Sequence, residues 1–191
     1  MAAGTTSNRH MRKAIRDIVE PALHAMGFDG DYPVFHRLTG TEWHGLAIRT
    51  DKYGGGFSID MARGPFSRAR YLRLRKTDPA QARLPDIADY DRRQRASLWH
   101  EDASGRWSGD FRYDTIRDDP DACRALASEL AALLPEAGLW LGEGRIGPHV
   151  SANFADPPGR PDSQRSRTAA RTVLRMLTGW PRRDKDGVYR P

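Results

Sequence analysis

Apolar residues recur every three or four positions between Met11 and Met26, a spacing that places them on one face of a helix. The members of this stripe are Met11, Ile15, Ile18, Val19, Ala22, Leu23 and Met26. Pro21 interrupts the pattern and predicts either a kink or two short helices, with Pro21 opening the second one. Gly27 predicts the end of the helix, because glycine adopts the left-handed conformation without strain.

Apolar and polar residues then alternate along several short segments, which predicts β-strands. Five strands are expected, at residues 34–39, 42–50, 56–62, 94–101 and 106–114. Gly40-Thr41 suits a two-residue hairpin loop between the first two strands. Residues 103–105 form the turn between the last two strands, and residues 149–154 suit one more short strand.

A second amphipathic helix is expected at residues 119–134, where Asp119 is a good N-cap and Pro120 suits the first helical position. Its apolar stripe consists of Ala122, Cys123, Leu126, Ala127, Leu130, Leu133 and Leu134. Pro135 and Gly138 predict the end of this helix.

Residues 63–91 follow neither period. Their first half contains six cations with no acid among them: Arg63, Arg68, Arg70, Arg73, Arg75 and Lys76. Prolines and aspartates follow, which predicts an irregular surface segment. Its length is a mild indication of function, because long loops are often functional or mobile.

The order of these elements predicts a single α+β domain at residues 9–155, in which an antiparallel sheet of about five strands has helices packed on one face. The composition changes at residues 156–161, which are rich in proline and predict a linker. A basic helical extension then reaches residue 191, with a helix expected at residues 163–177.

The composition excludes several classes of protein. The 191-residue chain has one cysteine, so it has no internal disulfide and no zinc site built from several cysteines. No apolar run approaches the ~18 residues of a membrane helix. Residues 1–8 are small and polar, unlike a secretory signal, so we expect a cytoplasmic protein with no membrane partner.

The net charge of +6 is unevenly distributed. Residues 1–159 contain 22 basic and 22 acidic residues, whereas residues 160–191 contain 9 basic and 3 acidic residues. The whole excess of positive charge therefore lies in the C-terminal tail, which makes the tail the expected contact for a polyanion.

Several short motifs follow the outline of a known family. They are Pro21-Ala22-Leu23, Gly27-Phe28, Phe35-His36-Arg37, the strand from Trp43 to Thr50, Lys52-Tyr53-Gly54-Gly55 and Phe57-Ser58-Ile59-Asp60. With the hairpin that carries Trp99 and Trp107 and the helix at 119–134, residues 9–142 resemble the domain of unknown function 4304 family, which is mostly bacterial. The resemblance implies an α+β fold but no established activity and no catalytic residues, and it leaves the basic tail outside.

Two histidines on neighbouring strands, His36 and His44, first suggest a metal pair. A two-residue hairpin loop pairs Arg37 with His44 and His36 with Gly45, so the two imidazoles point to opposite faces of the sheet. Because a metal site needs convergent ligands, we expect ordinary strand histidines here and no metal.

Three other features suggest chemistry less strongly. The run Gly54–Gly56 suits a turn rather than a phosphate loop, because a strand and not a helix follows it. Asp51, Lys52 and Asp60 would suit a metal-dependent nuclease only if they converged, so a solvated turn is the expectation. Cys123 lies on an apolar stripe, where a cysteine is a small buried hydrophobe rather than a nucleophile.

Five tryptophans occur along the chain: Trp43, Trp99, Trp107, Trp140 and Trp180. We expect them mainly in the core rather than on a stacking platform for bases. His100 and His149 have no close acidic or histidine partner in the sequence, so only the fold could give them one.

The tail contains the strongest binding candidates. Arg167, Arg171 and Arg175 lie four residues apart and form one stripe along the expected helix, and Arg182 and Arg183 follow. This stripe suits phosphates or an acidic protein, and the alternative is a solvated helix face.

The sequence as a whole favours a non-catalytic binding or protein-interaction module with no cofactor, whose partner is an unknown protein or a polyanion. A nucleic-acid-binding protein that uses the tail is the alternative. A hydrolase or nuclease with a site assembled across the sheet is a third hypothesis.

Overall fold

The first helix of the protein contains one wide turn. A computed structural model describes residues 8–51, 54–102, 104–153, 155 and 157–161. In it, α1 (Arg9–Ala14) and α2 (Glu20–Ala25) are joined by a π-helical turn (Ile15–Val19). Pro21 lies in the first turn of α2, as one of the two expected arrangements predicts, but the helices are joined by the wide turn rather than by a break.

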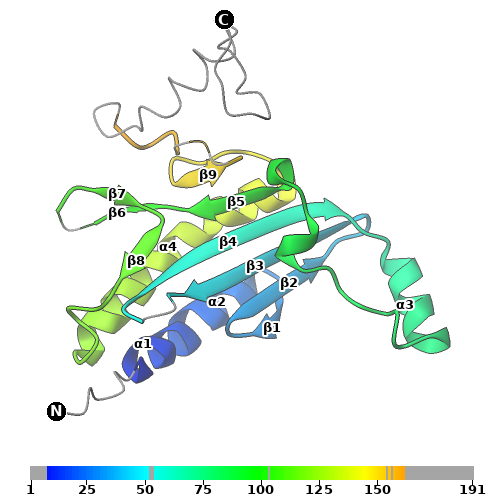
Figure 1. Cartoon of the computed structure of the whole chain (residues 1–191), viewed down its shortest axis with the longest axis horizontal. Coiled ribbons are helices and arrows are strands. Elements are labelled where there is room, and N and C mark those ends of the chain that lie inside the picture. The colour runs from blue at the N-terminus through cyan, green and yellow to red at the C-terminus, as the bar shows by residue number, and fades with distance from the viewer. Residues whose placement is uncertain (1–7, 52–53, 103, 154, 156, 162–191) are drawn as a thin grey trace, which may run out of the picture.

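The end of α2 and the hairpins after it follow the expected pattern. Gly27 has a φ of 81°, as expected at the end of a helix. The next four strands, β1 (Asp29–Asp31), β2 (Val34–Leu38), β3 (Glu42–Thr50) and β4 (Gly56–Pro65), form an antiparallel meander (Figure 1). The register pairs Arg37 with His44 and His36 with Gly45, which confirms the predicted hairpin.

The sheet has seven strands rather than about five. The remaining members are β5 (Arg95–Leu98), β8 (Asp110–Arg112) and β9 (Val150–Ala152), and the order is β1-β2-β3-β4-β5-β9 with β8 also paired to β4. A separate two-stranded sheet consists of β6 (His100–Glu101) and β7 (Trp107–Ser108). The strand expected at 94–101 is thus divided into β5 and β6, and the strand expected at 106–114 into β7 and β8. The division arises because β5 and β8 pair with different stretches of β4. The antiparallel α+β class is confirmed.

The helix α4 (Pro120–Glu143) is longer than expected. It continues through Pro135 and Gly138 and ends at Gly144, which has a φ of 72°. The apolar stripe continues beyond Pro135, so burial offsets the hydrogen bond that a proline removes. Gly138 provides space, because a Cβ there would lie 2.7 Å from Cε of Met26.

A further helix, α3 (Arg68–Thr77), occupies about a third of the expected irregular segment at residues 63–91. Ser67 caps its N-terminus by accepting a hydrogen bond from the N–H of Arg70 at 3.2 Å. No side chain of α3 is buried, and the helix stands away from the sheet and from the other helices (Figure 1). The sequence of α3 has no apolar stripe, so its periodicity could not predict a helix.

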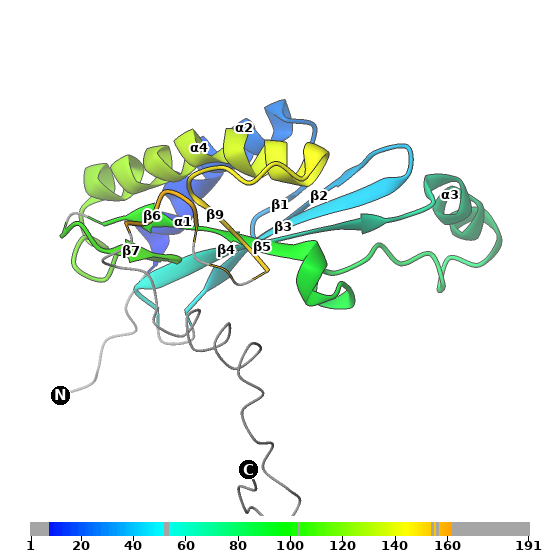
Figure 2. The same cartoon turned by 90° about the horizontal axis from the view of Figure 1, so that it is seen from above.

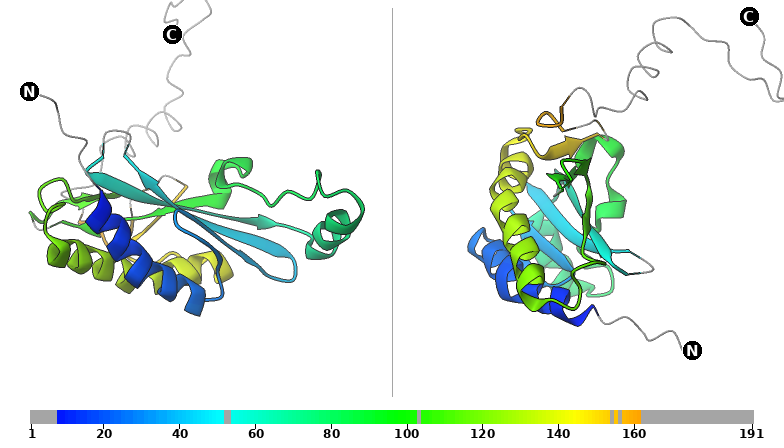
Figure 3. Two further views of the ribbon diagram at one scale, coloured as in Figure 1. Left: turned by 90° about the horizontal axis from the view of Figure 1, so that it is seen from below. Right: turned by 90° about the vertical axis from the view of Figure 1, so that its left-hand side faces the viewer.

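The other helices and the sheet form two layers. Figure 2 and Figure 3 show α1, α2 and α4 together on one face of the sheet. The main core lies between them and joins residues such as Leu23 and Leu130 to Leu46 and Ile59 of the strands. A smaller cluster on the opposite face contains Trp43, Ala47, Ala62, Ile87 and Tyr90.

The expected burial of most tryptophans is confirmed. Trp43, Trp107 and Trp140 are buried, and Trp99 is half-buried. Cys123 is fully buried in α4, where burial raises the pKa of its thiol. Among the described residues, no helix is both long enough and apolar enough to cross a bilayer. The helix expected at residues 163–177 lies outside the described residues.

Candidate functional site

The tail residues named above as binding candidates, Arg167, Arg171, Arg175, Arg182 and Arg183, lie outside the described residues. The structure therefore does not test the tail stripe. The candidate surfaces that it does describe lie on α3, along β3, at the C-terminal ends of α2 and α4, and beside α2.

The most exposed basic feature is α3, which we call the basic arm. It carries five cations and no acid: Arg68, Arg70, Arg73, Arg75 and Lys76. None of them forms an ion pair with an acid of the described residues. Leu72 on the same helix is 45% exposed, so the arm presents both charge and apolar surface to solvent.

The base of the basic arm is fixed by a few local contacts. The ring of Tyr71 lies 5.7 Å from the ring of Phe66, between their centroids. Arg83, on the returning chain, forms an ion pair with Asp89 at 2.7 Å. These contacts lie at the base of the arm and leave its cations exposed.

A groove of about 640 Å³ runs along β3, and we call it the β3 groove. Its apolar floor is the exposed side chain of Val34 above Trp43 and Ala47, which are only 1% and 5% exposed. The indole of Trp43 stacks on the ring of Tyr90, with 5.2 Å between the ring centroids. Its rim includes Arg12, Arg16, Tyr32 and Arg49. The groove therefore combines an apolar floor with a basic rim.

A buried polar network joins β2, β3 and β4 to the ends of two helices. His44 is 1% exposed, and Arg37 donates to its Nδ1 from Nε at 3.3 Å and from Nη2 at 3.1 Å. Its Nε2 lies 3.2 Å from Oε2 of Glu42, which also accepts hydrogen bonds from Arg63. Arg37 donates to the carbonyl of Met26 and Arg63 to the carbonyl of Trp140, both at 2.9 Å.

These contacts determine the protonation state of His44. Arg37 is only a donor, so Nδ1 must be an unprotonated acceptor, and Nε2–H then donates to Glu42. Burial lowers the pKa of His44 most strongly, and the positive charges of Arg37 and Arg63 lower it further against the opposing effect of Glu42. The network thus contains a neutral imidazole, and the arginines place positive charge at two helix C-termini.

Two more histidines receive partners from α4, which the sequence could not reveal. His100 Nδ1 lies 2.7 Å from Oε1 of Glu129, and His149 Nδ1 lies 2.7 Å from Oε1 of Glu136. Burial opposes the charged form of His100 most strongly. The hydrogen bond that His100 donates to Glu129 and the other favourable contacts outweigh burial and raise the pKa of His100. Both pairs connect the later strands to α4.

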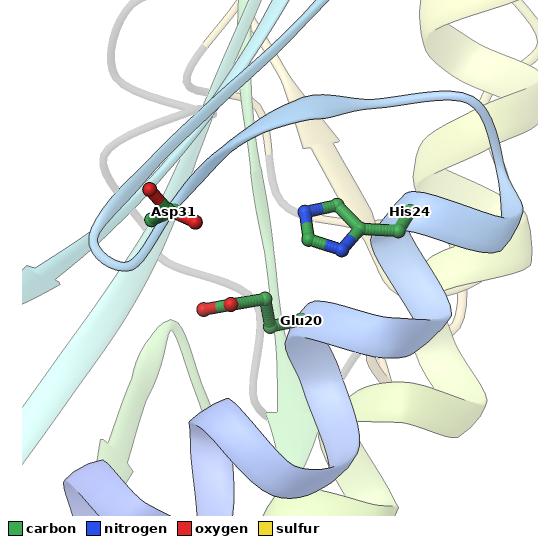
Figure 4. Close-up of side chains that lie close together, drawn as sticks. All are labelled: Glu20, His24 and Asp31. Carbon is green, nitrogen blue, oxygen red and sulfur yellow. The ribbon is translucent and has the colours of Figure 1, made fainter.

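The side chains of Glu20, His24 and Asp31 come together beside α2 (Figure 4). One ligand atom from each lies within 4.8 Å of the others, so these residues could hold a cation. Glu20 already accepts the N–H of Tyr32 at 3.2 Å, and His24 Nε2 lies 2.8 Å from the carbonyl of Gly30. Glu20 and His24 thus attach the β1–β2 hairpin to the helix, and a cation would have to compete with those bonds.

The acids considered for a nuclease site pair with arginines instead. Asp60 forms an ion pair with Arg49 at 2.5 Å, and Asp51 lies 3.3 Å from Nη1 of Arg112. Lys52 lies outside the described residues. Gly54 and Gly55 have positive φ values of 79° and 84°, which fits the expected turn.

Known proteins provide no guide to these surfaces. The chain matches no model of a protein family, no curated protein and no solved structure. Membership of the domain of unknown function 4304 family therefore stays a prediction. The β3 groove was missed at the level of sequence, although Arg12 and Arg16, one turn apart on the polar side of the first helix, were a local signal for it.

Proposed function

We propose that this protein is a non-catalytic module that binds the phosphate backbone of a nucleic acid through its basic arm. The observation that carries the proposal is α3, a ten-residue helix with five cations, no acid and no buried side chain. Such a helix gains little from packing, so its composition is better explained by a partner than by the fold.

The polar side chains that converge in the structure are already hydrogen-bonded to one another, which favours a binding role over a catalytic one. His44 is enclosed, and its two ring nitrogens are occupied by Arg37 and Glu42. A catalytic base needs access to a substrate proton, which this environment does not offer. The other converging side chains, in the pairs His100–Glu129 and His149–Glu136, connect the later part of the chain to α4.

A nucleic acid is favoured over an acidic protein by the distribution of charge on the arm. At 100° per residue, the five cations spread around most of the helix rather than along one docking stripe. Apolar anchors, which protein interfaces use for affinity, are reduced to Leu72 on the exposed side. Repeated phosphates can approach such a helix from several directions.

The test compares two variants of the full chain that remove the same amount of charge. The arm variant carries Arg68→Gln, Arg73→Gln and Arg75→Gln. The control carries Arg117→Gln, Arg124→Gln and Arg145→Gln elsewhere on the surface, where Arg124 and Arg145 are exposed and Arg117 is half-exposed. Fluorescence anisotropy measures binding to a labelled duplex over a range of salt concentrations.

We expect the arm variant to bind more weakly and its log–log salt slope to fall by about 2.7, at about 0.9 for each lost phosphate contact. The control should keep the affinity and slope of the wild type. Equal losses in both variants would indicate non-specific charge and contradict the proposal. A third variant, with Arg167→Gln, Arg171→Gln and Arg175→Gln, measures the share of the tail, and loss of binding in that variant alone would refute a role for the arm.

A further inference from the structure

We infer that the β3 groove is a binding site for a small anion with a planar ring, of the nucleoside monophosphate class. This inference goes beyond the proposed function, because no residue of the basic arm lines the groove. It rests on the size of the groove, its apolar floor and the arginines at its rim.

The size and floor of the groove suit a planar ring. Its volume of about 640 Å³ falls within the range of small-molecule sites. Trp43 and Ala47 project from the same face of β3, opposite the main core, and Val34 beside them is 48% exposed. Val34 is among the few large apolar side chains exposed in the described part of the chain, and a ring seated here would cover it.

The rim provides the charge for a phosphate. Arg12 and Arg16 lie one turn apart on the first helix, and neither has an acidic partner among the described residues. The guanidinium of Arg16 lies 5.7 Å from the centroid of the Tyr32 ring, which supports it from one side. Arg49 approaches from β3 and uses Nε for Asp60, so its terminal nitrogens can still donate to a ligand.

The other polar groups of the groove are consistent with an anion. Asp86 is the acid of the lining, and its Oδ1 already accepts the N–H of Ala88 at 2.9 Å. The three arginines therefore outnumber the carboxylates of the lining. The indole N–H of Trp43, a residue that also lines the groove, is buried without an acceptor in the described part of the chain.

The test is calorimetric titration of the full chain with adenosine monophosphate at low salt, with adenosine and inorganic phosphate as matched probes. We expect adenosine monophosphate to bind at one site. Adenosine and inorganic phosphate should each bind at least tenfold more weakly, because the floor and the rim of the groove act together. The groove variant, Arg16→Gln with Arg49→Gln, should lose at least tenfold in affinity. Both side chains are exposed, so the fold should persist, which a thermal melt checks.

The arm variant of the previous section is the control and should bind adenosine monophosphate as the wild type does. Saturable binding that the groove variant leaves unchanged would place the ligand elsewhere and overturn the inference. Absence of saturable binding, or equal affinity for inorganic phosphate alone, would overturn it as well. Because nucleic-acid binding is measured separately, on the arm variant and its own charge-matched control, failure of the groove and failure of the arm are distinguishable.

Discussion

The ion pair between Arg63 and Glu42 should contribute measurably to stability, unlike the surface ion pairs of this protein. Arg63 Nη2 donates to both carboxylate oxygens of Glu42, at 3.2 and 3.1 Å, while Nη1 donates to the carbonyl of Trp140 at 2.9 Å. The two charged side chains are 23% and 32% exposed. Arg63→Met removes these bonds and keeps most of the apolar stem.

The magnitude follows from this partial burial. Removing one partner of a fully buried pair costs about 3–5 kcal/mol, and exposed pairs contribute about 0.2–1 kcal/mol. An intermediate exposure places the cost of Arg63→Met at about 2–3 kcal/mol. The carbonyl of Trp140 keeps the N–H of Gly144 as a donor, so most of the loss comes from the carboxylate of Glu42, which then has only the hydrogen bond from His44.

A double-mutant cycle with Glu42→Gln tests this reasoning. Urea unfolding of the wild type, both single variants and the double variant should give a coupling energy of about 1–2 kcal/mol. The matched control is the pair Arg83 and Asp89, whose side chains are 70% and 43% exposed and whose coupling should stay below about 0.5 kcal/mol. Equal coupling energies in the two cycles would refute the assigned role of the network.

Three further predictions concern the core, the packing of a tyrosine ring on a strand glycine, and pH. Leu130→Asp should cost several kcal/mol in urea unfolding because it buries an unpaired charge, whereas Leu72→Asp on α3 should cost less than about 0.5 kcal/mol; similar values would contradict the core described here. Gly64→Ala should lower the melting temperature, because its Cβ would lie 2.1 Å from a tyrosine ring atom, and Gly40→Ala, with open space around it, should not; equal melting temperatures would count against this packing. The pKa of His44 is lower in the folded chain than in the unfolded chain, so the unfolded chain takes up this proton at a higher pH. The contribution of the neutral His44 to stability is therefore fully present above the ordinary pKa of about 6.5 and is lost as the pH falls through the lowered pKa. Urea unfolding between pH 5 and 8 should show a smaller loss at low pH in His44→Phe than in the wild type, and identical profiles would show that His44 is not the titrating group.

Part of the fold could be predicted because neighbouring residues determine it. The stripe from Met11 to Met26 determined the first helix, since a period near 3.6 leaves one apolar face to bury. The loop at Gly40-Thr41 determined the register of β2 and β3, because a two-residue loop admits one pairing. That register also placed His36 and His44 on opposite faces.

The length of α4 was decided by a partner distant in sequence. Pro135 and Gly138 read locally as the end of a helix, but the stripe beyond them is buried and Gly138 faces Met26. Only the packing of two helices separated by more than a hundred residues makes a glycine favourable there. The helix α3 shows the opposite case, because a helix without a buried face leaves no periodic signal.

The candidate sites divide in the same way. The cations of the basic arm were visible in the sequence as a run without acids, and the structure added that they form an exposed helix. Arg16 and Arg49 meet in the β3 groove because the first helix lies beside β2 and β3, and the carboxylates of α4 reach His100 and His149 across the chain. The periodicity of the sequence indicates which face of an element is buried. Which residues of different elements come into contact is determined by tertiary packing, so it can be seen only in the folded chain.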